Sequence, residues 1–545
     1  MKFNFSDGFN KIIRRFFSLD KKKKILVILC LILFLGGLIS LIVNFYYHHS
    51  IVLPKKGGEI KIGLVGEPQS INPVITRAND SDRILIELLY NGLLKVDGKG
   101  GLKNDLADKI EISADGSSYL IFLKENIFWH DGVPLTADDV VFTIETIQDK
   151  NFQSPIRDIW QGVVVEELSS NAVRLTLKNN NQVFLQNLTL KILPKHIWEN
   201  IDFKSFSRTD YNLKPIGTGP FVFENLEKSS NGQIISYTLV RNEKYFVRSP
   251  YLDKIKFIFY DNYTDLKNGL LKGEVKAMFP LYSEDYSFFQ KKSGFNLKQL
   301  LLNRYFAVFW NLNTDIFKDK TVREALELAV DKKKLQTEIL NNQAIILDGP
   351  FNNFSQPEGN NYSPERAKEL INGREINFTL SLPENYELIR VGQYLVSSWE
   401  QIGVKADLQI LPLSELEKEV ILPRNYQSLL FGEILNQSLD LFSFWHSSQT
   451  GVNGLNLSSF SNKELDKLIE ENWNAEEEKR QENFQKMQKI FEDEKPALFL
   501  YNPYYLYLLP QQLKGQAVQT ANIPAEIFSD VENWYLFAER NWSFN

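Results

Sequence analysis

The longest apolar segment of the chain lies near its start. Residues Ile25 to Val43 read ILVILCLILFLGGLISLIV and contain no charged side chain. At ~1.5 Å per residue a helix of this length reaches about 28 Å, close to the hydrocarbon thickness of a bilayer. Lys21 to Lys24 precede the segment, and Phe45 to Tyr47 follow it. Because basic flanks stay in the cytoplasm and aromatic residues favour the interface, the pattern predicts a transmembrane anchor with its N-terminus inside.

Two other interpretations of this segment are less favoured. A cleaved signal peptide has a shorter apolar region, about 7–15 residues, and an A-x-A-like exit, neither of which is present. A lipidated cysteine follows small residues, whereas Cys30 follows Val27, Ile28 and Leu29. The retained anchor is therefore favoured, with a basic cytoplasmic segment at 1–24, the anchor at 25–43 and a short tether at 44–58, and cleavage stays the alternative.

After the tether, the hydrophobic pattern changes between period two and helical spacing. Strand-like alternation occurs at 58–65, 118–129 and 170–179, and helical spacing occurs at 81–94, 320–340 and 462–473. Residues 474–495 are highly charged but carry an apolar stripe through Phe484, Met487 and Phe491. We interpret that segment as a surface helix, so the chain is expected to be mixed α/β.

The stretch FWHDGVPLTADDVVFTIE (128–145) places a His beside an Asp, which raises the question of a chemical site. Asp131-Gly132 is a turn pair, and Thr136 is a suitable N-cap with two Asp residues in the first helical turn. One His and one Asp fall short of the three or four ligands of a zinc site. The stretch is therefore interpreted as strand, tight turn and capped helix, with His130 in a structural role.

Composition and charge narrow the function. The 545 residues exceed what one core holds, so two or three lobes are expected. Residues 1–24 contain eight Lys/Arg and two Asp, a charge of +6, so the whole-chain charge of −6 leaves −12 on the remainder. An acidic exterior argues against a nucleic-acid partner. Cys30 is the single cysteine, so the exterior part has no internal disulfide.

Several motifs in one order give the chain a resemblance to a known family. Residues 128–143 (FWHDGVPLTADDVVFT) resemble a signature of the extracellular solute-binding proteins of family 5, the oligopeptide-, dipeptide- and nickel-type binding components of ABC importers. Further matching pieces are EPQSINP (67–73), LLYNGLLKVDGKGGLKNDLAD (88–108), KPIGTGPFVF (214–223), KDKTVREALELAVDKKKL (318–335), SPERAKELI (363–371), WEQIGVKADL (399–408), LSSFSNKELDKLI (457–469) and DEKPALFLY (493–501). The resemblance covers about residues 57 to 505.

The resemblance implies a periplasmic-binding-protein-like, class II type, bilobal α/β fold with an additional third domain. Lobe I would be discontinuous and combine 59–80, 190–300 and 498–545. An inserted domain II would occupy 81–189 and lobe III 301–497. Ligand would bind between lobes and close them, and the closed form would be recognised by the permease.

The resemblance also points to candidate ligand-binding residues. The segment after the first strand supplies Glu67, Gln69 and Ser70, and the segment 432–448 (GEILNQSLDLFSFWHSS) supplies Glu433, Asn436, Gln437, Asp440, Trp445 and His446, with Tyr501 as a further candidate. In peptide-binding members an Asp of this second segment holds the free amine of the peptide. Gln437 stands at that position here and forms no ion pair with an ammonium group, so free-amine recognition would depend on Asp440 or Glu433. Packing is an equal alternative for Trp445 and His446.

We therefore expect a membrane-anchored receptor that captures a peptide-like or other polar ligand and delivers it to an ABC permease and its ATPase, without catalysis, cofactor or metal. The main domain would lie outside the cell membrane. One alternative is a signalling or scaffold receptor that reuses the fold. A less favoured one is a tethered hydrolase, since His130, His196 and His446 lie in no G-x-S-x-G or H-E-x-x-H context.

Overall fold

The computed structural model describes residues 15–543 except 77–78, 179–181, 352–361, 436–438, 440, 452–453 and 474. It contains two compact units, which are described separately. The smaller comprises Met1–Lys56 and Tyr535–Asn545, and the larger comprises Gly57–Trp534.

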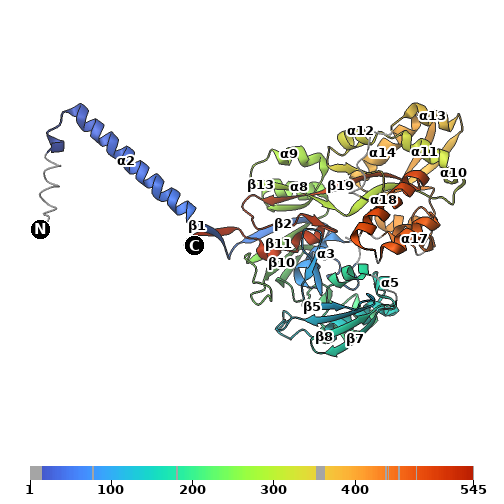
Figure 1. Cartoon of the computed structure of the whole chain (residues 1–545), viewed down its shortest axis with the longest axis horizontal. Coiled ribbons are helices and arrows are strands. Elements are labelled where there is room, and N and C mark those ends of the chain that lie inside the picture. Colours follow the sequence, from blue (N-terminus) through green and yellow to red (C-terminus); the bar gives the residue numbers. More distant parts are fainter. Residues whose placement is uncertain are drawn as a thin grey trace. The chain divides into compact units, whose positions relative to one another are not determined.

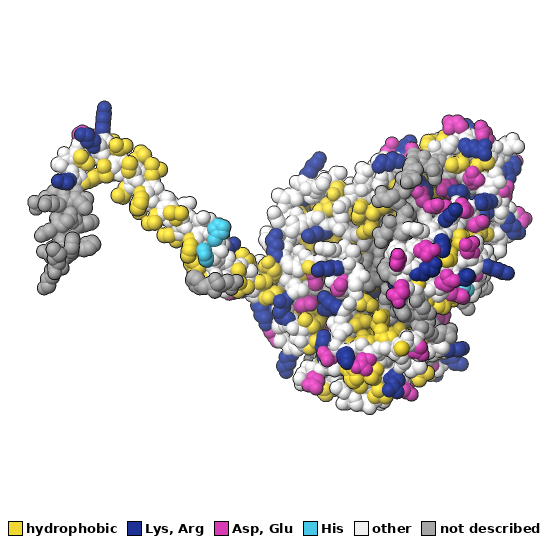
Figure 2. All heavy atoms as spheres, in the orientation of Figure 1, with side chains coloured by type: hydrophobic (Ala, Val, Ile, Leu, Met, Phe, Trp, Pro, Cys, Tyr) yellow, Lys and Arg dark blue, Asp and Glu magenta, His cyan; other side chains and the backbone are white. Residues whose placement is uncertain are grey.

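The smaller unit contains the predicted anchor. Helix α2 (Lys21–His48) begins at the N-cap Asp20 and is long and apolar enough to cross a membrane. Hydrophobic side chains cover its surface in Figure 2, and none of its residues is buried. Strand β1 (Ser50–Lys55) follows and pairs antiparallel with the last strand, β21 (Phe537–Trp542).

The larger unit is built on one mixed sheet with thirteen strands in the described residues. Its main path runs β17-β16-β18-β14-β19-β12-β2-β11-β10-β9. The first half-sheet contains β2 (Glu59–Val65), β9 (Phe221–Lys228), β10 (Ile234–Arg241), β11 (Lys254–Tyr260), β12 (Ala277–Leu281) and β13 (Phe295–Leu302), with β20 (Thr520–Ala521) beside β13. The second half-sheet contains β14 (Arg304–Trp310), β15 (Ala344–Ile346), β16 (Ile376–Pro383), β17 (Val404–Leu411) and β18 (Ser428–Ile434). Strand β19 (Ala497–Pro510) belongs to both half-sheets, because it pairs with β13 and with β14.

The second half-sheet is buried on both faces. Along β14, Val308 and Trp310 enter one hydrophobic cluster, whereas Tyr305 and Phe309 enter another, because successive side chains of a strand point to opposite faces. The first cluster is covered by α11 (Lys320–Leu328), α13 (Pro364–Ile371) and α14 (Tyr386–Glu400), and the second by α17 (Lys463–Asn472) and α18 (Glu477–Glu494), as Figure 1 shows. The short helix α16 (Phe442–Trp445) also contributes to the second cluster. Phe484, Met487 and Phe491 of α18 are buried, which confirms the predicted apolar stripe.

The first half-sheet has its own cluster, in which α8 (Tyr263–Lys272) covers β12 and β19. Strand β2 is parallel to both β11 and β12 and buries Ile60, Ile62 and Leu64. Helix α3 (Asp80–Leu89) follows it, and α9 (Tyr286–Gln290) precedes β13.

A separate four-stranded sheet, order β5-β6-β8-β7, lies in residues 107–176 (Figure 1). Its strands are β5 (Ala107–Ile112), β6 (Ser118–Leu123), β7 (Val164–Ser169) and β8 (Ala172–Thr176), and the small β3 (Leu94–Val96)–β4 (Leu102–Asn104) pair precedes it. Helices α4 (Ala137–Gln148), α5 (Arg157–Trp160), α6 (Lys195–Trp198) and α7 (Phe203–Phe206) lie in the same part of the chain.

The motif at 128–145 folds as a turn and a capped helix. Phe128 bridges to Pro134, and α4 begins after Thr136, whose amide donates to the Asp139 carboxylate at 2.9 Å. The same carboxylate accepts from the Lys195 amide at 2.8 Å. His130 Nδ1 accepts from the Gly217 amide at 3.2 Å, so the histidine positions the loop at 214–220.

Three expected elements end earlier than the pattern suggested. The helix predicted over 320–340 stops at Leu328, because Asp331 caps a new short helix, α12 (Lys332–Lys334), which passes into a π-helical turn, Leu335–Ile339. The helix predicted over 81–94 ends at Leu89. The strand predicted over 118–129 ends at Leu123, before Asn126 adopts a positive φ of 59°.

The division into three lobes stays a prediction. Within the described residues, β2, β11, β12 and β19 (Ala497–Pro510) share a sheet although they come from distant parts of the chain. One expected boundary differs, because Tyr535–Asn545 forms a unit with the anchor and tether and not with Gly57–Trp534.

Candidate functional site

The segment after β2 is held in place by the start of α3. The Asp82 carboxylate accepts hydrogen bonds from the amides of Gln69 at 2.8 Å and Ser70 at 3.0 Å, and the Ser81 hydroxyl donates to the Gly66 carbonyl at 2.6 Å. Burial raises the pKa of Asp82 to about 6, although the two amides act to lower it. These hydrogen bonds therefore hold the loop at 66–70 against the N-terminal end of α3.

The three residues predicted in this loop have different surroundings. The Glu67 carboxylate accepts from the Ile234 amide, which ties the loop to β10. The Ser70 hydroxyl lies 3.4 Å from Asn212 Oδ1. Gln69 is exposed. A ligand role for all three stays a prediction, and Gln69 has the most accessible side chain.

Glu433 and Trp445 meet in the core behind β14 and β18. The Tyr305 hydroxyl donates to Glu433 and accepts from the Trp445 indole at 2.8 Å. Trp445 is 1% exposed and packs against Phe491 at a ring-centroid distance of 4.8 Å. Burial raises the pKa of Glu433 well above its usual value, which favours the neutral carboxyl. Glu433 is 3% exposed and bonded to Tyr305, so it is a poor counter-charge for a ligand ammonium.

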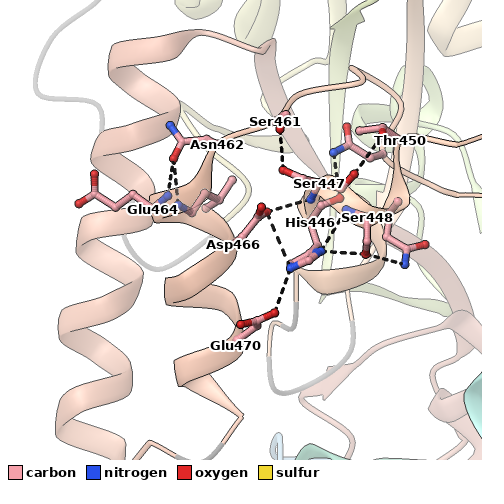
Figure 3. Close-up of polar contacts among 12 residues, drawn as sticks. His446, Ser447, Ser448, Thr450, Ser461, Asn462, Glu464, Asp466 and Glu470 are labelled. Carbon is pink, nitrogen blue, oxygen red and sulfur yellow. Dashed lines mark hydrogen bonds and ion pairs between the residues drawn. The ribbon is translucent and has the colours of Figure 1, made fainter.

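His446 forms part of a local polar network (Figure 3). Its Nδ1 lies 2.8 Å from the Ser448 hydroxyl and 3.1 Å from the Ser448 amide, which caps the short helical turn Ser447–Gln449. Its Nε2 lies 3.3 Å from Glu470 and 3.9 Å from Asp466, both on α17. These contacts fix the segment to α17. Asn436, Gln437 and Asp440 lie outside the described residues.

Tyr501 belongs to β19 and is buried. Its ring is stacked on Phe306, with centroids 5.3 Å apart and an angle of 14°. Burial and the nearby charge of Glu387 raise the pKa of Tyr501, and Arg304 acts in the opposite direction. The charges of Glu387 and Arg304 therefore both act on Tyr501.

Arg304 is the first residue of β14, and the charges of two acids on helices of different half-sheets act on it. Its guanidinium donates to the Pro503 carbonyl at 3.3 Å, and its buried Nε has no hydrogen-bond partner among the described residues. Burial lowers its pKa, whereas the charges of Glu387 and Asp80 act to raise it. This half-buried guanidinium retains hydrogen-bonding capacity for an anionic group.

The two acids approach Arg304 from opposite half-sheets. Glu387, on α14, accepts from the hydroxyl of Ser283, which precedes α9 in the other half. Asp80, the first residue of α3, is exposed, yet desolvation raises the pKa of its carboxyl. The charges of Asp80 and Glu387 thus both act on the Arg304 guanidinium.

A pocket of about 240 Å³ lies beside the end of β18. It is lined by Val96, Leu102, Gln186, Asn187, Thr189, Ile434, Leu435 and Asn522. Two lining residues come from the β3–β4 pair, and Ile434 and Leu435 belong to the start of the predicted ligand segment 432–448. Its volume is below the ~300 Å³ of an ordinary small-molecule site, so it suits at most a ligand side chain.

None of Arg304, Asp80 and Glu387 stands out in the sequence. The one available signal is that Arg304 begins an otherwise apolar strand, RYFAVFW (304–310). Its proximity to α3 and α14 depends on the sheet order, which local pattern does not give. Among the described residues, no group of three or more His, Cys, Asp or Glu side chains is placed to hold a metal ion.

Comparisons with known proteins give consistent results. Residues 101–454 match the family model described as bacterial extracellular solute-binding proteins, family 5 Middle. The oligopeptide-binding protein AppA of Bacillus subtilis (strain 168) is 28% identical over 89% of this chain and 92% of its own length. The structure of AppA in complex with a nonapeptide superposes with a TM-score of 0.75 and 26% identity, covering 89% of this chain and all of that one. NikZ from Campylobacter jejuni in complex with Ni(L-His) shares the fold, with a TM-score of 0.74, 24% identity and coverage of 88% and 99%.

Proposed function

The chain belongs to the bacterial extracellular solute-binding proteins of family 5, and on this basis we propose that it captures a peptide or another zwitterionic solute between its half-sheets for an ABC permease. The resemblance predicted from the motifs is confirmed, and so is the mixed α/β fold of periplasmic peptide-binding proteins. AppA is an oligopeptide-binding protein, which supports a peptide ligand. NikZ is in complex with nickel and L-histidine in its crystal structure, so a chelate is the second ligand class to test.

One observation carries the proposal, namely the way the two half-sheets are connected. Strand β13 ends at Leu302 and β14 begins at Arg304, so this crossover is one residue long. Strand β19 pairs with β14 through Tyr501 and with β13 from Tyr504 onward. Two adjacent connections of this kind form a hinge, and rotation about them opens and closes a cleft.

The charges beside the hinge suit a ligand with both an amino and a carboxyl group. Arg304 would bind the carboxylate through charge-assisted hydrogen bonds, and Asp80 or Glu387 would attract the ammonium. Because Glu433 is buried with a raised pKa and Gln437 carries no charge, the acids whose charges act on Arg304 are the better candidates for amine recognition among the described residues. The ligand would thereby contact both half-sheets and stabilise the closed form.

Helix α2 would retain the protein at the membrane, with the solute-binding part on the outer side. The helix has the length and composition of a membrane span, and four lysines at its start favour a cytoplasmic N-terminus. A cleaved signal sequence has the same position in a chain, so N-terminal mass analysis of the mature protein distinguishes the two.

Ligand binding is tested by thermal unfolding of the exterior domain with peptide pools of different lengths, and with Ni²⁺ plus histidine. Ligand at ~100 times its dissociation constant raises the free energy of unfolding by about 2.7 kcal/mol. Native mass spectrometry of the purified protein would then identify a retained solute. An unchanged melting temperature with every ligand class would reject the proposal and favour a scaffold receptor.

A further inference from the structure

The last strand of the chain is attached to the tether that follows the membrane helix. Strands β1 and β21 pair in register from Ser50↔Trp542 to Lys55↔Phe537. The Ser543 amide donates to the His49 carbonyl at 2.8 Å, and Lys55 lies 3.7 Å from Glu539. The two ends of the exterior part therefore form one ribbon directly beyond α2.

Side chains of β21 reach back onto the last turn of α2 itself. The Arg540 guanidinium lies 4.4 Å from the ring centroid of Tyr47 and donates to the Tyr47 carbonyl at 3.3 Å. The Tyr46 hydroxyl donates to the Arg540 carbonyl at 2.9 Å. Trp542 packs edge-on against Tyr46, with centroids 4.8 Å apart, and lies 6.2 Å from Phe45.

These aromatic side chains are also accessible to solvent. Phe45 is 54%, Tyr47 58% and Trp542 49% exposed. Helix α2 has 28 residues, which corresponds to about 42 Å, whereas the hydrocarbon core is ~30 Å thick and the bilayer with its headgroups ~40–45 Å. If Lys21 to Lys24 lie at the inner surface, the last helical turn lies in the outer headgroup layer.

We propose that β21 is part of the membrane anchor: Trp542 and Arg540 join Phe45, Tyr46 and Tyr47 in a collar that contacts phospholipid headgroups where the helix leaves the bilayer. Amphipathic aromatic rings favour this layer, and an arginine provides a donor to phosphate oxygens. The chemistry of the collar and its continuity with α2 select the lipid surface as its partner. This inference rests on the proposed anchor.

The collar can form only if the helix is retained in the mature protein. Phe45, Tyr46 and Tyr47 are residues of α2, so removing the helix as a signal sequence would remove the groups on which Trp542 and Arg540 pack. We therefore expect the helix to be retained in the mature protein.

The test uses the full-length protein in phosphatidylcholine–phosphatidylglycerol vesicles that carry bromine quenchers close to the headgroup. The chain has nine tryptophans, and Trp542→Phe should remove a quenched component that the wild type shows. Trp473→Phe, at the end of α17 in the larger unit, is the matched control and should leave that component intact. Equal quenching in wild type and Trp542→Phe would overturn the collar, including the case in which the ribbon contacts a permease instead of lipid.

Two further measurements separate the collar from the anchor. Resistance to alkaline extraction tests the anchor alone, and loss of the protein from the vesicles would reject both ideas. In a Cys30→Ser background, Ile51→Cys with Asn541→Cys should form a disulfide in the membrane, because the two positions pair directly. Ile51→Cys with Phe537→Cys is the off-register control and should remain reduced. Failure of the first pair to cross-link, with the anchor retained, would reject the ribbon.

Discussion

His130 Nε2 lies 3.1 Å from the carbonyl oxygen of Gly219, while Nδ1 of the same ring accepts from the Gly217 amide. One imidazole thus bridges both sides of a tight loop from a distant part of the chain. Since Nδ1 accepts and Nε2 donates, the ring is held as the neutral tautomer, and desolvation lowers its pKa to about 4. The motif at 128–145, which raised the question of a chemical site, instead connects two distant segments of the chain.

The neutral His130 predicts a specific pH dependence of stability. The unfolded chain protonates histidine near pH 6.5, whereas the folded chain does so near 4, so between these values the unfolded state binds more protons. The contribution of His130 is complete above about pH 6.5 and decreases by about 3 kcal/mol as the pH falls to about 4. Denaturant unfolding of wild type and His130→Asn across this range measures the difference, which should vanish if the ring is charged in the fold.

Asp82→Ala should loosen the loop at 66–70. The amides of Gln69 and Ser70 lose their shared acceptor, which costs about 2 kcal/mol of unfolding free energy. Ligand affinity should fall as well, because the loop would have to be ordered on binding. Asp82→Asn keeps one acceptor oxygen and serves as the control, with a smaller loss in both measurements. Calorimetric titration with the identified ligand gives the affinity, and wild-type affinity in Asp82→Ala would place the loop outside the site.

Arg304→Ala should weaken binding of ligands that carry a carboxylate. Losing a charge-assisted hydrogen bond costs about 2 kcal/mol, or roughly thirtyfold in dissociation constant. The same peptide with an amidated C-terminus should bind wild type and variant with similar affinity. Arg366→Ala, an exposed residue of α13 paired with Glu369, is the matched control. Equal losses for the acid and the amide would mean that Arg304 acts on packing.

Glu433→Gln should leave stability and affinity close to wild type, within about 1 kcal/mol, because the raised pKa favours a neutral carboxyl and the amide has the same shape. Glu433→Ala should destabilise the protein by a few kcal/mol, since Tyr305 loses its acceptor and a cavity remains. Thermal unfolding and ligand titration distinguish the two variants. A large affinity loss in Glu433→Gln, with stability unchanged, would indicate an ionised Glu433 that faces the ligand.

Local pattern predicts the elements whose signals lie within one segment. Strand β2 and helix α17 match the expected ranges closely, and the N-cap at Thr136 follows from its own four residues. The helix expected over 320–340 is interrupted after Leu328 and resumes at Lys332, because Asp331 offers a side-chain cap that competes with continuing the first helix. Periodicity does not register such a competing hydrogen bond.

The contacts of the candidate site are harder to predict from the sequence than the helices and strands. Trp445 and His446 are candidates for ligand contact because of their residue types, but their partners, Tyr305 and Glu470, are contributed by β14 and α17. Arg304 is not a candidate by residue type or motif, and it becomes one only because the charges of acids on α3 and α14 act on it. Which side chains meet across a sheet depends on strand order, and a single sequence leaves that order open.

The continuous strand β19 sets a mechanical limit on closure. Its ladder changes partner between Tyr501 and Tyr504, and Pro503, which has no amide hydrogen to donate, lies within that interval. On its other edge the same interval remains paired with β15, from Ile346↔Tyr501 to Ala344↔Pro503, so a twist of one half against the other would be taken up next to Pro503, where β15 ends and β13 begins to pair. Strand β19 would twist mainly at this one position, so a bound ligand would need to supply only a small elastic energy to hold the two halves together. Release of the ligand would then require the strand to untwist there and would not require either half to unfold.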